Sequence, residues 1–245
     1  MKASSRAALI WAASALAIAL GAWFYYRTWN VAPRRAMSHR ELATRFLAQY
    51  IETHYSGKPV LVVSNPFTQK GGRDPQIYAF EEAGLSGLRK GFGKATQMKV
   101  VFPDVRPEFL KNPRSVQVDP RTTTPLSFLV AENAFDKLAK ENPECDLIVS
   151  LIGLPVNLAQ VEIWRTSDVP RFALLLPDLR FLGNQQAIQG AVKSGKLVAA
   201  ILNKPGAPPE TVFSGGNDKA EFDKRFLLVT AENIDNLMRS HPQLF

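Results

Sequence analysis

The sequence predicts an α/β fold with a three-layer, open, mostly parallel sheet of about six strands, either Rossmann-like or flavodoxin-like. Short runs rich in Val, Leu and Ile recur along the chain, separated by segments in which apolar residues follow helical spacing. Strands that alternate with helices in this way pair in parallel through right-handed crossovers. A long uncharged apolar run precedes this pattern and predicts an N-terminal transmembrane helix.

The apolar run extends from Ala7 to Tyr26 and ends on four aromatic residues, Trp23–Tyr26. A helix of about 20 apolar residues spans the hydrocarbon layer, and aromatic rings at its end prefer the headgroup zone. A cleaved signal peptide is the alternative, because basic residues precede the run and the small residues Ala19, Gly21 and Ala22 resemble a cleavage site. We favour the anchor because the aromatic cluster extends the run to spanning length.

The chain divides into three parts on this interpretation. Residues 1–30 form the anchor or signal segment, residues 31–57 a juxtamembrane linker and helix, and residues 58–245 the α/β domain. Basic residues flank the apolar run on both sides, so the positive-inside rule assigns no orientation. A short flank before one apolar segment is typical of exported proteins, which places the domain outside the cytoplasm (periplasmic), or makes it secreted or periplasmic after cleavage.

The first elements after the anchor have clear boundaries. Val31–Met37 is expected to be a linker, and Ser38 with Glu41 three residues later forms a capping box. A helix with one apolar face should therefore cover Arg40–Tyr55. The run Pro59–Ser64 follows, and its Val and Leu residues without polar alternation predict a strand that is buried on both faces.

The remaining elements alternate along the chain. Expected helices are Gln76–Lys90, Pro125–Glu141, Val156–Arg165, Gln185–Val192 and Glu232–Arg239, and expected strands are Met98–Phe102, Asp146–Ile152, Phe172–Leu176, Leu197–Leu202 and Phe226–Thr230.

Long connections follow three of the strands, namely Asn65–Pro75, Pro103–Thr124 and Asn203–Phe222. They leave the carboxyl ends of the strands, where open parallel sheets hold their ligand crevice. Each polar residue in these connections can be explained by hydrogen bonds within a turn or at a helix end. Only several of them lying close together in space would indicate a binding site. The candidate ligand-binding residues are Ser64, Asn65, Thr68, Lys70, Asp104, Asp178 and Asn203.

Composition argues against several classes of site. The net charge of +8 is concentrated near the apolar run, which favours lipid headgroups as partners and argues against nucleic acid. Cys145 is the single cysteine, so no intramolecular disulfide can form, and a small buried residue is the favoured interpretation. The three histidines, His39, His54 and His241, lie away from the expected crevice. We therefore predict no Ser-His-Asp triad, no metal site and no cofactor.

Two glycine motifs suggest anion binding but lack the expected context. Lys70-Gly71-Gly72-Arg73 could hold an anion on its backbone amides, although a flexible turn is the favoured interpretation. Gly87, Gly91 and Gly93 lack the spacing of a phosphate loop and follow a helix instead of a strand.

The strand Asp146–Ser150, followed by Gly153 and by the segment Val169–Phe172, resembles the strand-and-turn rhythm of one lobe of periplasmic substrate-binding proteins, and equally of flavodoxin-like response domains. Fold analogy of this kind carries no function. The functional hypothesis is a membrane-anchored extracytoplasmic domain that binds a small ligand or a protein partner, such as an envelope protein, and has no recognisable catalytic apparatus. The alternatives are a hydrolase or transferase that uses loop carboxylates such as Asp104 and Asp178, and a structural envelope interaction protein.

Overall fold

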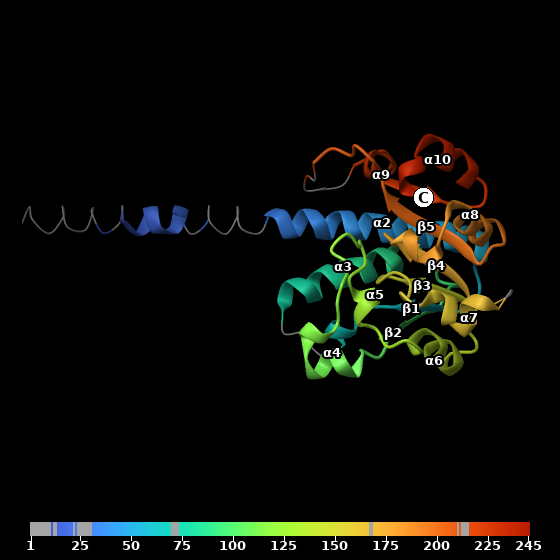
Figure 1. Cartoon of the computed structure of the whole chain (residues 1–245). Coiled ribbons are helices and arrows are strands. Elements are labelled where there is room, and N and C mark those ends of the chain that lie inside the picture. The colour runs from blue at the N-terminus through green and yellow to red at the C-terminus, as the bar shows by residue number, and fades with distance from the viewer. Residues whose placement is uncertain are drawn as a thin grey trace, which may run out of the picture.

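The computed structural model of the chain describes residues 11, 14–21, 23, 31–69, 74–166, 169–209, 211 and 216–245. It confirms a mixed α/β fold with one six-stranded, mostly parallel sheet (Figure 1). The strands lie within two residues of their predicted boundaries: β1 Val60–Val63, β2 Met98–Val101, β3 Leu147–Ser150, β4 Arg171–Leu175, β5 Leu197–Asn203 and β6 Phe226–Val229.

The strand order is β2-β1-β3-β4-β5-β6, with β1 to β5 parallel and β6 antiparallel to β5. This is the flavodoxin-like order, extended by one antiparallel edge strand. The chain moves outward in opposite directions from β1 and β3, so the topological switch point lies between these two strands. An open sheet is expected to bind its ligand at the carboxyl end of such a pair.

Helices cover both faces of the sheet (Figure 1). Helices α2 (Val31–Tyr55), α3 (Pro75–Gly91) and α9 (Asp218–Arg225) pack on one face. Helices α6 (Ala134–Glu141), α8 (Gln185–Lys193) and α10 (Ile234–Ser240) pack on the other. Alternate residues of the buried strands therefore enter two cores, with Val60 and Val62 on the α2 side and Leu61 and Val63 on the α6 side. The shorter helices are α4 (Pro107–Lys111), α5 (Leu126–Leu129), α7 (Glu162–Arg165) and the 3₁₀ turns η1 (Pro66–Thr68), η2 (Pro113–Ser115), η3 (Leu158–Gln160), η4 (Leu179–Leu182) and η5 (Pro242–Leu244).

Helices α2 and α3 run side by side in the same direction, at a distance that only glycine permits. A Cβ atom on Gly87 would lie well under 3.0 Å from the Thr44 hydroxyl and the Glu41 carbonyl oxygen, and one on Gly91 would lie 2.6 Å from the Ala48 Cβ. The glycines that lacked a phosphate-loop spacing thus serve helix packing.

The predicted linker and capping box before α2 are wrong. Helix α2 already includes Val31–Met37, and the Ser38 hydroxyl donates to the Arg35 carbonyl inside it at 2.8 Å. The Ser38 side chain therefore bonds back to the preceding helical turn and does not cap the start of a helix. The Glu41 carboxylate accepts a hydrogen bond from Lys90 on α3 at 2.6 Å instead of closing a capping box.

Two predicted helices are shorter than expected. The Pro125–Glu141 segment forms α5 and α6, because Val130 between them is extended and bridges to Val105. Within Val156–Arg165 only η3 and α7 form.

Two predicted loops contain helices. The Pro103–Thr124 connection includes α4, and the Asn203–Phe222 connection runs into α9. Helix α9 shows no apolar residues at helical spacing, because its sequence is mostly polar and Phe222 is its one buried apolar residue.

Half of the expected transmembrane helix Ala7–Tyr26, ten of its 20 residues, falls outside the described residues. Within the part of the chain that the structure describes, no helix combines the length and apolar character needed to cross a membrane.

Candidate functional site

The crevice at the switch point, between the ends of β1 and β3, is filled by the chain's own polar groups. Ser64 and Asn65 follow β1, and both turn inward to the carboxylate of Glu81 on α3. That carboxylate accepts from the Ser64 hydroxyl at 2.6 Å and from the Asn65 backbone amide at 3.0 Å. Glu81 itself is only 4% exposed.

Arg40 on α2 neutralises the buried Glu81 carboxylate. Its guanidinium lies 2.6 Å from a Glu81 oxygen, reaches the Leu151 carbonyl after β3 at 3.5 Å, and stacks on the Phe80 ring at 4.5 Å. Burial lowers the pKa of Arg40, and the Glu81 charge opposes that shift. The ion pair therefore joins α2 and α3 to both strands of the switch point.

The opposite side of the same crevice is closed by the start of α5 and the residues before it. Gly153 has a φ of +86°, and a Cβ atom there would meet Thr124 and Ser127 at under 3.0 Å. The Ser127 hydroxyl also donates to the Ile152 carbonyl at 3.0 Å. The side chains of Glu81, Thr124 and Ser127 thus occupy much of the switch point, and a cavity of about 250 Å³ borders Glu81 beside Phe102, which follows β2.

Thr68 and Lys70 belong to the connection after β1. The Thr68 hydroxyl donates to the Asn65 carbonyl at 2.8 Å and borders a small cavity of about 250 Å³ together with Tyr78 and Phe102. Lys70 and the Lys70-Gly71-Gly72-Arg73 motif lie outside the described residues.

Asp104 lies apart from the other candidate residues. It follows the edge strand β2 and pairs with Lys137 on α6 at 2.7 Å, which raises the pKa of Lys137. Strands β1 and β3 separate it from β4 and Asp178, a spacing of about 14 Å across the sheet. Asp104 and Asp178 therefore do not form the carboxylate pair that a hydrolase would need.

Asp178 and Asn203 come together at a cavity of about 640 Å³ at the carboxyl ends of β4 and β5. The amino end of α8 closes one side, and the segment around η5 closes another. The lining combines apolar side chains, neutral amides and charged groups: Arg121, Thr123, Leu176–Arg180, Gly183–Gln185, Ile188, Leu202, Asn203 and Gln243–Phe245.

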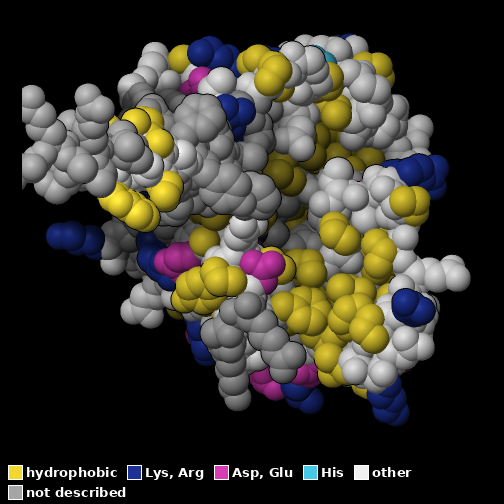
Figure 2. Space-filling model, turned by 90° about the vertical axis from the view of Figure 1, so that its left-hand side faces the viewer, with side chains coloured by type: hydrophobic (Ala, Val, Ile, Leu, Met, Phe, Trp, Pro, Cys, Tyr) yellow, Lys and Arg dark blue, Asp and Glu magenta, His cyan; other side chains and the backbone are white. Residues whose placement is uncertain are grey.

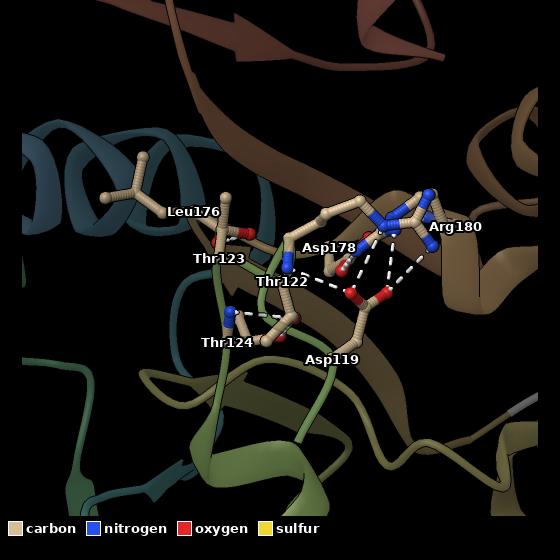
Figure 3. Close-up of polar contacts among 8 residues, drawn as sticks. Asp119, Thr122, Thr123, Thr124, Leu176, Asp178 and Arg180 are labelled. Carbon is tan, nitrogen blue, oxygen red and sulfur yellow. Dashed lines mark hydrogen bonds and ion pairs between the residues drawn. The ribbon is translucent and has the colours of Figure 1, made fainter. Parts of the chain in front are cut away.

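Charged groups at the rim of this cavity form one ion-pair cluster (Figure 3). The Asp178 carboxylate accepts from Arg180 Nε at 2.8 Å and Nη2 at 2.5 Å, and Arg180 Nη1 lies 3.0 Å from Asp119. Arg121 lies 3.2 Å from the same Asp119 carboxylate. The two carboxylates and two guanidinium groups leave the cluster with no net charge.

The cluster ties the long loop after β2 to the end of β4. The Thr123 hydroxyl donates to the Leu176 carbonyl at 3.3 Å (Figure 3), and Leu176 has a φ of 46°, which is unusual outside glycine. Backbone conformations of this kind cost of order 1–3 kcal/mol and persist where surrounding contacts hold them.

The cluster is expected to open in acid. Hydrogen bonds from Arg121 lower the pKa of Asp119 to about 2. Burial alone would raise the pKa of Asp178, but hydrogen bonds from Arg180 and Thr122 outweigh it and lower the pKa. Both carboxylates therefore contribute stability that is present above their ordinary pKa near 4 and is lost as pH falls through their lowered pKa, which for Asp119 is about 2.

NMR titration of the carboxylate carbons would measure this shift. We expect a midpoint for Asp119 near 2. The Arg121→Gln variant should move that midpoint upward, while a wild-type midpoint near 4 would contradict the ion-pair geometry.

Sequence patterns did not reveal Arg40, Glu81 or Arg180, nor the contact between Arg180 and Asp119. Glu81 stands in an otherwise ordinary amphipathic helix, and nothing in its spacing indicates that it turns toward β1. Arg180 follows Asp178 by two residues, which is a usable local signal, but its contact with Asp119 spans 61 residues. Among the described residues, no group of three or more His, Cys, Asp or Glu side chains could hold a metal ion.

Comparison with known proteins gives no family. No protein-family model and no curated protein matches the chain. Similar solved structures include a carbohydrate transporter from Acidothermus cellulolyticus in complex with myo-inositol, which is 14% identical with a TM-score of 0.45 over 84% of this chain and 62% of that chain. A sugar-binding protein from Bacillus halodurans is 14% identical, with a TM-score of 0.44 over 81% of this chain and 64% of that one. A periplasmic solute-binding protein from Actinobacillus succinogenes with bound D-allose is 13% identical, with a TM-score of 0.40 over 80% and 60%. The chain spans less than two thirds of the length of these proteins, and similarities this low assign it no activity.

Proposed function

We propose that this protein is a membrane-anchored binding protein whose α/β domain lies outside the cytoplasm. The domain binds a small, uncharged, polar molecule and does not catalyse a reaction. The observation that carries the proposal is the cavity at the ends of β4 and β5, where Asp178 and Asn203 meet. Its volume of about 640 Å³ falls in the usual range for small-molecule sites, about 300–1,000 Å³.

The lining of the cavity favours a neutral ligand. Arg121 and Arg180 each pair with a carboxylate, so the cluster at the rim has no net positive charge to select an anion. Four amide side chains supply donors and acceptors beside an apolar floor that includes Leu179, Ile188 and Leu202: Asn184, Gln185, Asn203 and Gln243. Amides above an apolar surface suit a sugar or polyol, whose hydroxyl groups need both donors and acceptors.

Two features support binding over catalysis. Asp104 and Asp178, the carboxylates that a hydrolase would use, end strands that are not neighbours. Each is also occupied by an ion pair, with Lys137 and Arg180 respectively. The anchor in the proposal rests on the apolar run Ala7–Tyr26. The extracytoplasmic placement rests on the order of basic residues, apolar run and small residues, which is typical of the segments that export proteins.

Thermal unfolding of the full-length chain in detergent micelles tests this function. The probes are neutral monosaccharides and polyols, with nucleotides and charged amino acids for comparison. A ligand at a hundredfold excess over its Kd should add about 2.7 kcal/mol to the free energy of unfolding.

The Asn203→Ala variant should abolish the shift caused by a neutral sugar or polyol and leave the ligand-free stability unchanged. Its side chain lines the cavity but makes no hydrogen bond within the described part of the chain. Asn236→Ala, at an exposed position on α10, is the matched control and should retain the shift. A shift caused only by charged compounds, or by none, would contradict the proposed ligand class.

A further inference from the structure

We infer that the carboxyl edge of the domain carries a lipid-docking face, and that the bilayer itself covers it. The inference rests on the anchor proposed above. The face consists of five exposed apolar side chains, which we call the edge patch: Phe67, Ile77, Tyr78, Phe80 and Leu110.

The exposed apolar surface of the domain is concentrated at this edge. From Val31 onward, the described chain exposes six large hydrophobic side chains, and five of them form the edge patch, with exposures from 38% for Phe67 to 67% for Leu110. The sixth, Val169, lies at the opposite edge, before β4 begins. Scattered single residues would need no explanation, but their collection on one face indicates an interaction site.

Topology brings the five residues to one edge from three separate elements. Phe67 lies in η1 directly after β1, and Leu110 lies in α4 after β2. The other three occupy the first two turns of α3, which begins at the same edge. The ring centroids of Phe67 and Phe109 lie 5.8 Å apart in an edge-on contact that joins η1 to α4. Figure 2 looks onto this side of the molecule, and apolar side chains gather on it.

The chain enters the domain at the same edge. Arg40, near the start of α2, contacts the Leu151 carbonyl after β3, so the first turns of α2 lie at or beyond the carboxyl ends of the strands (Figure 1). The contacts of Gly87 with Thr44 and of Gly91 with Ala48 set a constant offset of 43 residues between α3 and α2. If the same offset holds to the amino ends of both helices, Tyr78 on α3 lies beside Arg35 on α2.

The edge patch therefore lies close to the proposed anchor. Only four residues, 27–30, separate the apolar run from the start of α2, and they span about 14 Å at most. A domain on so short a tether presents this edge to the headgroups. Aromatic side chains are favoured at that depth because the zone accepts both an apolar ring and a polar edge.

Charge at this edge favours an anionic surface. Lys111 and Arg114, next to Leu110, are exposed and make no ion pair with the described residues. Three nearby acidic side chains pair with cations, Glu82 with Arg89, Glu108 with Arg106 and Asp104 with Lys137, and the Asp74 carboxylate caps the start of α3 by accepting from the Gln76 amide. Free cations beside exposed apolar groups match a leaflet that contains anionic lipid.

Spin labelling of the full-length chain in nanodiscs tests the docking face. The discs contain an equimolar mixture of phosphatidylcholine and phosphatidylglycerol. The background is Cys145→Ala, which removes the one native thiol. Single labels at Tyr78→Cys and Leu110→Cys report on the edge patch, Leu16→Cys reports on the anchor, and Glu141→Cys, at the end of α6 on the amino edge, is the exposed control. The accessibility of each label to oxygen relative to a water-soluble nickel complex gives its depth, and an unchanged unfolding temperature shows that each variant is folded.

We expect the Tyr78 and Leu110 labels to have oxygen-to-nickel ratios close to that of Leu16 and well above that of Glu141. Edge-patch ratios equal to that of Glu141, with Leu16 immersed, would overturn the docking face while leaving the anchor intact. Labels at Tyr78 and Leu110 protected from both reagents would overturn it in favour of a protein partner. An immersed edge patch with Leu16 in water would support the docking face and reject the anchor, and all four labels in water would reject both.

Discussion

Replacing Glu81 with Ala should lower the free energy of unfolding by about 3–5 kcal/mol, the usual cost of removing one partner from a buried ion pair. The variant leaves the Arg40 guanidinium without its counter-ion, because among the described residues only the Leu151 carbonyl, at 3.5 Å, remains as an acceptor. The Ser64 hydroxyl and the Asn65 amide lose their acceptor as well. Chemical denaturation with urea would measure the change.

Glu82→Ala is the matched control for this prediction. Glu82 is the next residue on α3, its side chain is 44% exposed, and it pairs with Arg89 on the surface. Exposed pairs contribute about 0–1 kcal/mol, so the control should be nearly neutral. The double variant Arg40→Met, Glu81→Leu should recover most of the loss, since apolar replacements of buried pairs are often neutral or stabilising. Equal effects of Glu81→Ala and Glu82→Ala would show that the switch point is not sealed as described.

Replacing Gly87 with Ala should destabilise the protein by about 3 kcal/mol, at the upper end of the usual cost of overpacking. The new methyl group would overlap both the Thr44 hydroxyl and the Glu41 carbonyl, and a backbone oxygen cannot rotate away. Helices α2 and α3 would have to separate, which would loosen the apolar contacts of Leu47 and Leu88 between them and the sheet.

Gly190→Ala provides the control with the same chemical change. Gly190 lies inside α8, and a Cβ atom there would meet nothing within 4 Å. Its replacement should stabilise the protein by about 0.5–1 kcal/mol through helix propensity alone. Thermal unfolding of both variants should shift in opposite directions. A stabilised Gly87→Ala variant would refute the close approach of α2 and α3.

The strands were predictable because each buried strand consists of consecutive apolar residues. Val60–Val63 has no polar position, and such a run suits only a strand covered on both faces. Helix boundaries were harder, because local signals compete with packing. Ser38 and Glu41 form a plausible capping box, yet α2 continues back to Val31, and Glu41 bonds to Lys90 on α3.

The sequence predicted only in part which candidate residues lie together in the folded protein. The long loops pointed to the carboxyl edge as the place of a site, which stays a prediction, and Asp178 and Asn203 both line the cavity of about 640 Å³ there. Ser64 and Asn65 looked equivalent to them in sequence, but both bond to a buried carboxylate on α3. The difference depends on Glu81 and Arg40, whose roles have no signature in local spacing.

By itself the sequence determined the α/β class, the positions of the six strands and the edge on which polar loops collect, because each depends on the order of apolar and polar residues along a short segment. Tertiary structure alone decided that the order of strands is β2-β1-β3-β4-β5-β6, that polar groups of the chain occupy the switch point and that Asp178 and Asn203 line a cavity at the ends of β4 and β5. Those outcomes depend on contacts such as Arg40 with Glu81, 41 residues apart, and Asp119 with Arg180, 61 residues apart. Local sequence patterns predict neither of these two contacts, because the free energy of burying a charge depends on which distant residue lies beside it in the folded protein.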